Sequence, residues 1–195
     1  MKLNENVIKT IIGAEYINGS FESENSDFIK YAYQEISYIS EKLFERIPFE
    51  VVFTSEDPYQ TGKEMRERVQ KEKKIYIYTD FSGHPYLTQE QNNISRAVHD
   101  VYAHLVCGCP FSFQGEYNAY LEQRKHYPKE YWKILFAEIP AQTSAFYFKG
   151  DFSYNQRAIE APDHWLEMCE GLKKDYSKNA VLNFKDSLLF RGENV

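Results

Sequence analysis

The sequence TQEQNNISRAVHDVYAHLV, residues 88–106, decides the fold class because it predicts a long helix in the middle of the chain. Thr88 can accept a hydrogen bond from the backbone amide of Gln91, and this spacing is that of a capping box. The next four residues, CGCP, contain a glycine and a proline that end the helical pattern. We therefore expect a helix from about Gln89 to Val106.

Helical spacing of apolar residues recurs on both sides of this segment, and two β-branched and aromatic runs read as short strands. The expected strands are FEVVFTS (49–55) and KKIYIYTDF (73–81). The other expected helices cover 26–47, 61–71, a segment from about 116, a long aromatic segment that contains Pro140, and 162–174. We expect one mainly helical α+β domain over 1–195, with two short strands in its N-terminal part and a helical C-terminal part that carries the functional site.

Composition excludes several functional classes. A chain of 195 residues with 43% hydrophobic content can bury one sizeable core. The net charge of −6, without a basic block, predicts no nucleic-acid partner and no anionic membrane surface. No apolar run approaches the roughly 18 residues of a membrane span, and the first residues lack a secretory signal. Three cysteines, an odd number, fit a reducing compartment, so we expect a cytoplasmic protein.

Aromatic residues are abundant, with sixteen tyrosines and fourteen phenylalanines. They predict a core and a pocket built largely from rings, which would suit an aromatic small-molecule substrate. The sequence leaves the identity of that substrate and the oligomeric state open.

Two of the five histidines, His99 and His104, lie five residues apart in RAVHDVYAH. On a regular helix this spacing separates them by about 140°, so they share a metal only if it lies beside the helix or if the last turn is distorted. Arg96 and Asp100 lie four apart and can form an ordinary ion pair. A polar helix face and the wall of a metal site are both open at this point.

The pattern HDVYAH resembles the HE-x-x-GH motif of the pterin-dependent aromatic amino acid hydroxylases, in which two histidines hold a non-haem iron. YWKILFAEIPAQ (131–142) is similar to the later aromatic segment of that family, which carries its glutamate ligand. The resemblance implies a 2-His-1-carboxylate site of His99, His104 and Glu138 with Fe(II) and an oxygenase or monooxygenase activity. It covers about 50 residues, and no segment matches the pterin-binding region, so a pterin is not expected to carry over. The chain also resembles bacterial and phage proteins without an assigned activity.

Several neighbours have possible roles around these ligands. Gln142 lies four residues after Glu138 and can donate to its carboxylate, while Pro140 should distort the helix there. Glu116 begins a helix, where it either complements the helix dipole or serves as a base or further ligand. Arg96 and His84 are candidates for orienting ligands or assisting proton movement.

Two alternatives to the iron oxygenase remain open. A zinc-dependent, peptidase-like hydrolase would use the same ligand types, with Asp100 or Glu116 as the base. A non-catalytic helical binding protein would use Arg96, Asp100 and the two histidines only as a structural polar network. The five-residue spacing of the histidines favours the iron-type arrangement.

Overall fold

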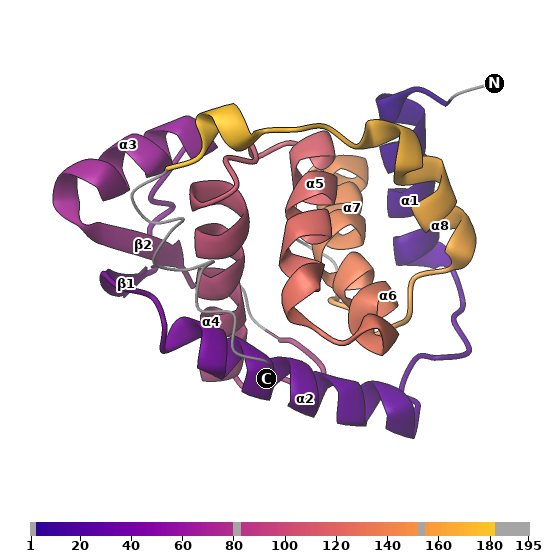
Figure 1. Ribbon diagram of the computed structural model, residues 1–195. Coiled ribbons are helices and arrows are strands. Elements are labelled where there is room, and N and C mark those ends of the chain that lie inside the picture. The colour runs from indigo at the N-terminus through magenta and orange to yellow at the C-terminus, as the bar shows by residue number, and fades with distance from the viewer. Residues whose placement is uncertain (1–2, 80–82, 152–154, 182–195) are drawn as a thin grey trace.

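Figure 1 shows the fold in a computed structural model, which describes residues 3–79, 83–151 and 155–181. The described residues are mainly helical and contain one two-stranded sheet, so the expected mainly helical α+β class is confirmed. The sheet and α3 (Gly62–Glu72) lie at one end of the molecule, and α1 (Glu5–Asn18) and α8 (Asp163–Cys169) lie at the other (Figure 1). Asp80 and Phe81, the last residues of the second expected strand, lie outside the described residues.

The central layer is α4 (Gln89–His99), which packs against α2 (Asp27–Phe44). The predicted capping box is present, because Thr88 accepts from the amide of Gln91 and the Gln91 side chain accepts from the amide of Thr88. The helix expected over 89–106 continues beyond α4 as a π-helical segment, η1 (Asp100–Leu105). Its hydrogen-bonding pattern therefore changes between the two histidines.

The N-terminal helix α1 was not expected from the sequence. Its buried side chains, Ile8, Ile12 and Tyr16, recur every four residues and face α7 (Gln142–Lys149), on which α1 packs. Asn4 caps its first turn by accepting from the amide of Asn6. The polar and apolar residues of this short segment are only weakly separated onto opposite faces. It is nevertheless helical, because its apolar face is buried against a helix that is distant in the sequence.

The two strands are β1 (Glu50–Thr54) and β2 (Lys74–Tyr78), which pair in parallel with Glu50 opposite Lys74. Helix α3 connects them and is capped by Thr61. Alternation is clearest in β2, where Ile75 and Ile77 are fully buried. Both expected strands and the intervening helix are confirmed.

Helix α5 (Phe113–Gln123) begins three residues before the expected start because Ser112 caps it by accepting from the amide of Gly115. The aromatic segment forms α6 (Trp132–Phe136), the π-helical segment η4 (Ala137–Ala141) and then α7. The expected distortion at Pro140 is present, since the amide of Gln142 bonds to the carbonyl of Ala137, five residues back. Short 3₁₀ segments cover Arg124–His126, Lys129–Tyr131, Glu170–Leu172 and Ser177–Asn179.

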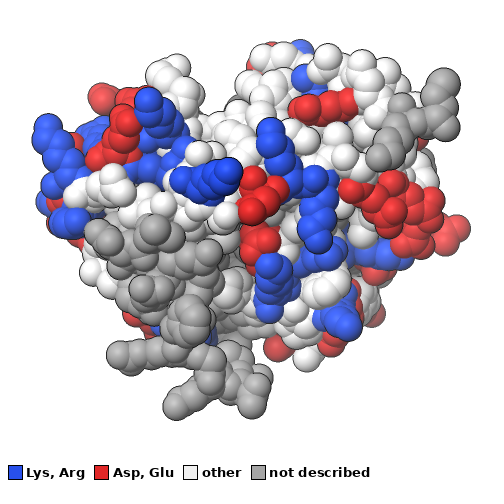
Figure 2. Space-filling view, turned by 45° about the horizontal axis from the view of Figure 1, so that its top comes forward, with Lys and Arg blue, Asp and Glu red and all other residues white. Residues whose placement is uncertain are grey.

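The surface carries charges of both signs. On the face shown in Figure 2, Lys and Arg side chains lie among Asp and Glu side chains. Within the described residues, no helix combines the length and the apolar character that crossing a bilayer requires.

Candidate metal centre

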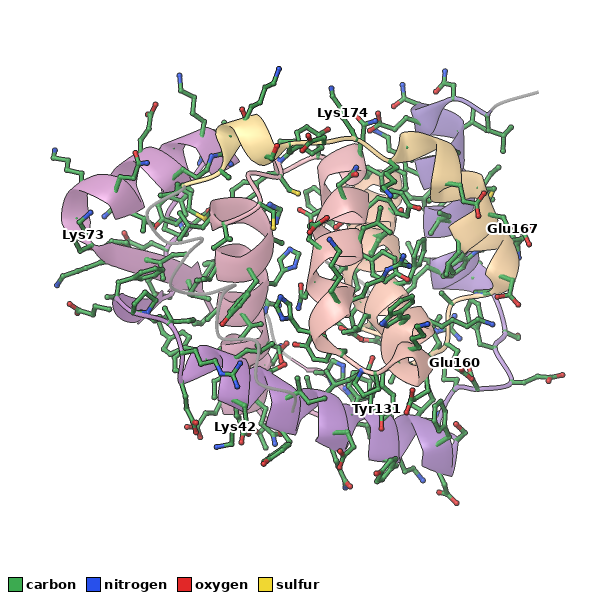
Figure 3. The ribbon with its side chains drawn as sticks, in the orientation of Figure 1. Lys42, Lys73, Tyr131, Glu160, Glu167 and Lys174 are labelled. Carbon is green, nitrogen blue, oxygen red and sulfur yellow. The ribbon has the colours of Figure 1, made fainter. Side chains whose placement is uncertain are left out.

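The two histidines of the opening motif line a cavity of about 730 Å³, whose wall includes residues of α2, α4, α5 and the α6–α7 segment. Figure 3 shows side chains filling the space between α4 and α5, while the labelled Lys42, Lys73 and Lys174 point outward. The site is therefore built where the central helix faces α5, and most of its groups are shielded from bulk water.

The π-helical turn brings His99 and His104 together. In η1 the hydrogen bonds run between residues five apart, as in the 2.9 Å bond from the amide of Val106 to the carbonyl of Val101. Residues five apart then lie closer to one face of the helix than on an α-helix, where they are about 140° apart. As a result, Nε2 of His99 and Nε2 of His104 are 2.9 Å apart.

Glu116 completes the cluster from the first turn of α5. Its Oε2 lies 3.1 Å from Nε2 of His99, and its Oε1 lies 3.3 Å from Nε2 of His104. The exposed fraction of the side chain is only 12% for Glu116 and 2% for His104. One carboxylate thus bridges two imidazoles in a largely buried position.

The other nitrogen of each imidazole is occupied by a protein acceptor. Nδ1 of His104 lies 3.0 Å from the backbone carbonyl of Cys109, which can only accept, so this nitrogen carries the proton. Nδ1 of His99 lies 2.8 Å from Oε1 of Gln123. The amide group of Gln123 also bonds to the hydroxyl of Tyr127, and this contact orients its oxygen towards His99. When both imidazoles are neutral, each therefore directs an Nε2 lone pair towards Glu116.

Converging lone pairs require a cation or a proton between them. Ligand atoms that surround one metal ion at about 2.0–2.2 Å lie about 2.8–3.6 Å from one another, and the separations of 2.9, 3.1 and 3.3 Å fall in this range. Hydrogen bonds from the Nδ1 atoms to a carbonyl and an amide oxygen are the contacts that fix the orientation of metal-binding histidines. The separations among His99, His104 and Glu116 are therefore of the size that a shared metal ion requires.

The pKa values show how strongly these groups interact. Burial alone would lower the pKa of His99, but the hydrogen bond and charge of Glu116, helped by Asp100 and Gln123, raise it to about 9. Burial would raise the pKa of Glu116, yet His104 and His99 hold it well below its usual range. A metal ion would replace the proton that the cluster otherwise shares.

Asp100 belongs to the same cluster. His99, Asp100 and His104 each offer a ligand atom within 4.8 Å of the others, so this group could also hold a metal. Burial raises the pKa of the Asp100 carboxyl, and the neighbouring His104, His99 and Arg96 oppose that shift. Arg96 lines the same cavity and acts on Asp100 through its charge.

Glu138 has different partners from those that the resemblance implies. Its carboxylate accepts from the hydroxyl of Tyr33, from Nε2 of Gln142 at 2.6 Å and from Nε2 of His84 at 3.3 Å. The bond expected from Gln142 is therefore present, and His84 lies beside Glu138. As a ligand beside the two histidines, Glu138 stays a prediction, whereas Glu116 is the carboxylate in contact with both.

Sequence reasoning did not identify Gln123, Tyr33 and the carbonyl of Cys109. Gln123 follows Glu116 by two turns of α5 and so shares its face, a signal that was available in the sequence. Tyr33 comes from α2, and nothing local in the sequence connects it with Glu138. Comparison with protein-family models, curated proteins and solved structures finds no match for this chain.

Proposed function

We propose that the protein is a mononuclear metal-dependent hydrolase whose ligands are His99, His104 and Glu116. The observation that carries the proposal is the convergence of two Nε2 atoms and one carboxylate, 2.9–3.3 Å apart, at the wall of a cavity. Three protein ligands leave a coordination position for water or substrate, as in catalytic zinc sites.

Asp100 is the proposed general base. It is next to a ligand in sequence, and one of its carboxylate oxygens lies within 4.8 Å of a nitrogen of each imidazole. Burial raises the pKa of this carboxyl, which moves it closer to the range that suits a base at neutral pH.

A divalent metal held by this ligand set would lower the pKa of a water molecule and polarise the carbonyl group that the water attacks. Asp100 would accept the proton of that water while the new carbon–oxygen bond forms. It would then return the proton to the leaving nitrogen or oxygen as the amide or ester bond breaks. The net reaction is hydrolysis, and no other reactant is consumed.

The non-haem iron oxygenase is the second candidate. Two histidines and one carboxylate also form the facial triad of Fe(II) oxygenases, and rings such as Tyr33, Tyr59 and Phe146 in the cavity wall would suit an aromatic substrate. We favour the hydrolase because the carboxylate in contact with both imidazoles is Glu116 on α5, and because a second, half-buried carboxylate, Asp100, lies beside the same imidazoles and can serve as a base.

Metal analysis of the wild-type chain and two matched variants tests the proposal. Glu116→Gln and Glu138→Gln each replace one carboxylate that lines the same cavity by an isosteric amide. We expect one zinc per wild-type chain, loss of that metal in Glu116→Gln and retention in Glu138→Gln. Hydrolysis of ester and amide substrates by the zinc form supports the hydrolase.

Oxygen uptake by the iron form, without hydrolysis by the zinc form, would support the oxygenase instead. A stoichiometric metal in Glu116→Gln would contradict the ligand assignment. Loss of the metal in Glu138→Gln alone would restore the triad that the resemblance implies.

A further inference from the structure

We propose that Glu138 forms a second binding subsite in the same cavity, which receives a primary ammonium group of the ligand. Glu138 and Tyr33 line the cavity that His99, His104 and Glu116 also line. The exposed fraction of the Glu138 side chain is 19%, so its carboxylate is mostly withdrawn from solvent.

Three donors hold this carboxylate in place. The hydroxyl of Tyr33 and Nε2 of His84 donate to Oε1, and Nε2 of Gln142 donates to Oε2. The donors come from α2, from the segment before α4 and from α7, so their convergence does not arise from one helix. A carboxylate with about four acceptor sites therefore has one site left, on Oε2.

The donors carry no compensating charge. Nδ1 of His84 accepts from the backbone amides of Tyr86, at 3.1 Å, and Leu87, at 2.9 Å. Because that nitrogen must keep its lone pair, the ring is neutral and its proton is on Nε2, which donates to Glu138. Tyr33 and Gln142 are neutral donors as well.

The negative charge of Glu138 consequently lacks a cationic partner among its contacts with described residues. Holding an unpaired charge away from water is costly unless a counter-ion arrives. Arg96 also lines the cavity, but its charge acts on Asp100. A ligand ammonium would donate to the remaining site on Oε2.

This subsite goes beyond the metal centre, because ammonium binding at Glu138 requires no metal. If the proposed hydrolase holds, the subsite selects substrates that carry an amine, such as peptides with a free α-amino or lysine group. That substrate class rests on the proposed function, whereas the binding itself does not.

Benzylammonium and its neutral analogue benzyl alcohol test the subsite. Their affinities are measured by calorimetric titration of the full chain, both zinc-loaded and after treatment with a chelator. We expect Glu138→Gln to weaken benzylammonium binding at least about tenfold, the size of a lost charge-assisted hydrogen bond, in both forms. Benzyl alcohol should bind wild type and variant equally.

Asp57→Asn is the matched control, because Asp57 lines the same cavity and its loss removes the same charge. This variant should keep wild-type affinity for benzylammonium. Equal weakening in both variants would show a general effect of cavity charge and overturn the subsite, as would an unchanged affinity in Glu138→Gln. A zinc content that falls in Glu138→Gln would make Glu138 a metal ligand and also overturn it.

A measurement on the wild-type chain keeps the proposal testable if Glu138→Gln does not fold. Nuclear Overhauser contacts are expected between the methylene protons of benzylammonium and the ring protons of Tyr33. Saturating ligand without any such contact would overturn the subsite. We expect Glu116→Gln to lose the metal and still bind benzylammonium. This result would support the Glu138 subsite independently of the proposed hydrolase.

Discussion

Replacing Gln123 by leucine should weaken metal binding without removing any ligand. The Gln123 side chain is almost fully buried, and its Oε1 lies 2.8 Å from Nδ1 of His99. Leucine is similar in size but cannot accept that hydrogen bond, so the imidazole loses the contact that fixes its proton on Nδ1. The Nε2 lone pair then faces Glu116 for only part of the time.

The expected loss in metal affinity is about 10- to 100-fold, because outer contacts of metal-binding histidines typically contribute this much. It corresponds to about 1.4–2.7 kcal/mol, by which the stabilisation of the chain at a fixed excess of zinc should also fall. Competition with a fluorescent zinc chelator gives the affinity, and thermal unfolding with and without zinc gives the stabilisation.

Gln142→Leu is the matched control, since it removes an amide that lines the same cavity and bonds to Glu138. It should leave the zinc affinity within about twofold of wild type, which is less than the effect of an outer contact to a ligand. Equal zinc affinities of Gln123→Leu and the wild-type chain would refute the role of Gln123. An equal loss of zinc affinity in Gln123→Leu and Gln142→Leu would refute the assignment of His99, His104 and Glu116 as the ligands.

Three further predictions concern catalysis, pH and packing. Asp100→Asn should keep one metal per chain but lower the rate of hydrolysis by about 10²–10⁴-fold, measured with the substrate found for the zinc form. The hydrogen bond from Arg157 lowers the pKa of Glu24 below its usual value near 4.5, so this pair stabilises the fold above that pH and the contribution is lost as the pH falls through the lowered pKa. Urea unfolding should therefore show that Arg157→Met costs about 1–3 kcal/mol at neutral pH and distinctly less in acid; a constant cost at both would contradict the linkage. A Cβ at Gly115 would overlap the carbonyl oxygen of Pro110, so Gly115→Ala should lower the melting temperature and the zinc affinity together, although alanine usually stabilises a helix.

The sequence predicts the helices with strong local signals and misses what depends on distant packing. The capping box of Thr88 and Gln91 and the alternation around Ile75 and Ile77 are local, and both elements are present where they are expected. Helix α1 has no comparable signal, because its stability depends on burial against α7, more than 100 residues later in the chain.

The candidate site divides in the same way. The five-residue spacing of His99 and His104 indicates that a shared metal needs a distorted turn, and η1 is such a turn. The local sequence does not determine which carboxylate contacts the histidines, because Glu116 and Glu138 both lie on helices that follow them in the chain. Only the packing of α5 against η1 places Glu116 beside the imidazoles, while Glu138 lies with Tyr33 and His84.

The position of the metal tests the central claim most directly. A crystal of the zinc-loaded chain, measured at the zinc absorption edge, gives an anomalous peak whose position does not depend on any activity. Our account predicts one peak per chain, about 2.0–2.2 Å from Nε2 of His99, Nε2 of His104 and a carboxylate oxygen of Glu116. A peak between His84 and Glu138, or zinc-soaked crystals without a peak between the two imidazoles, would contradict it.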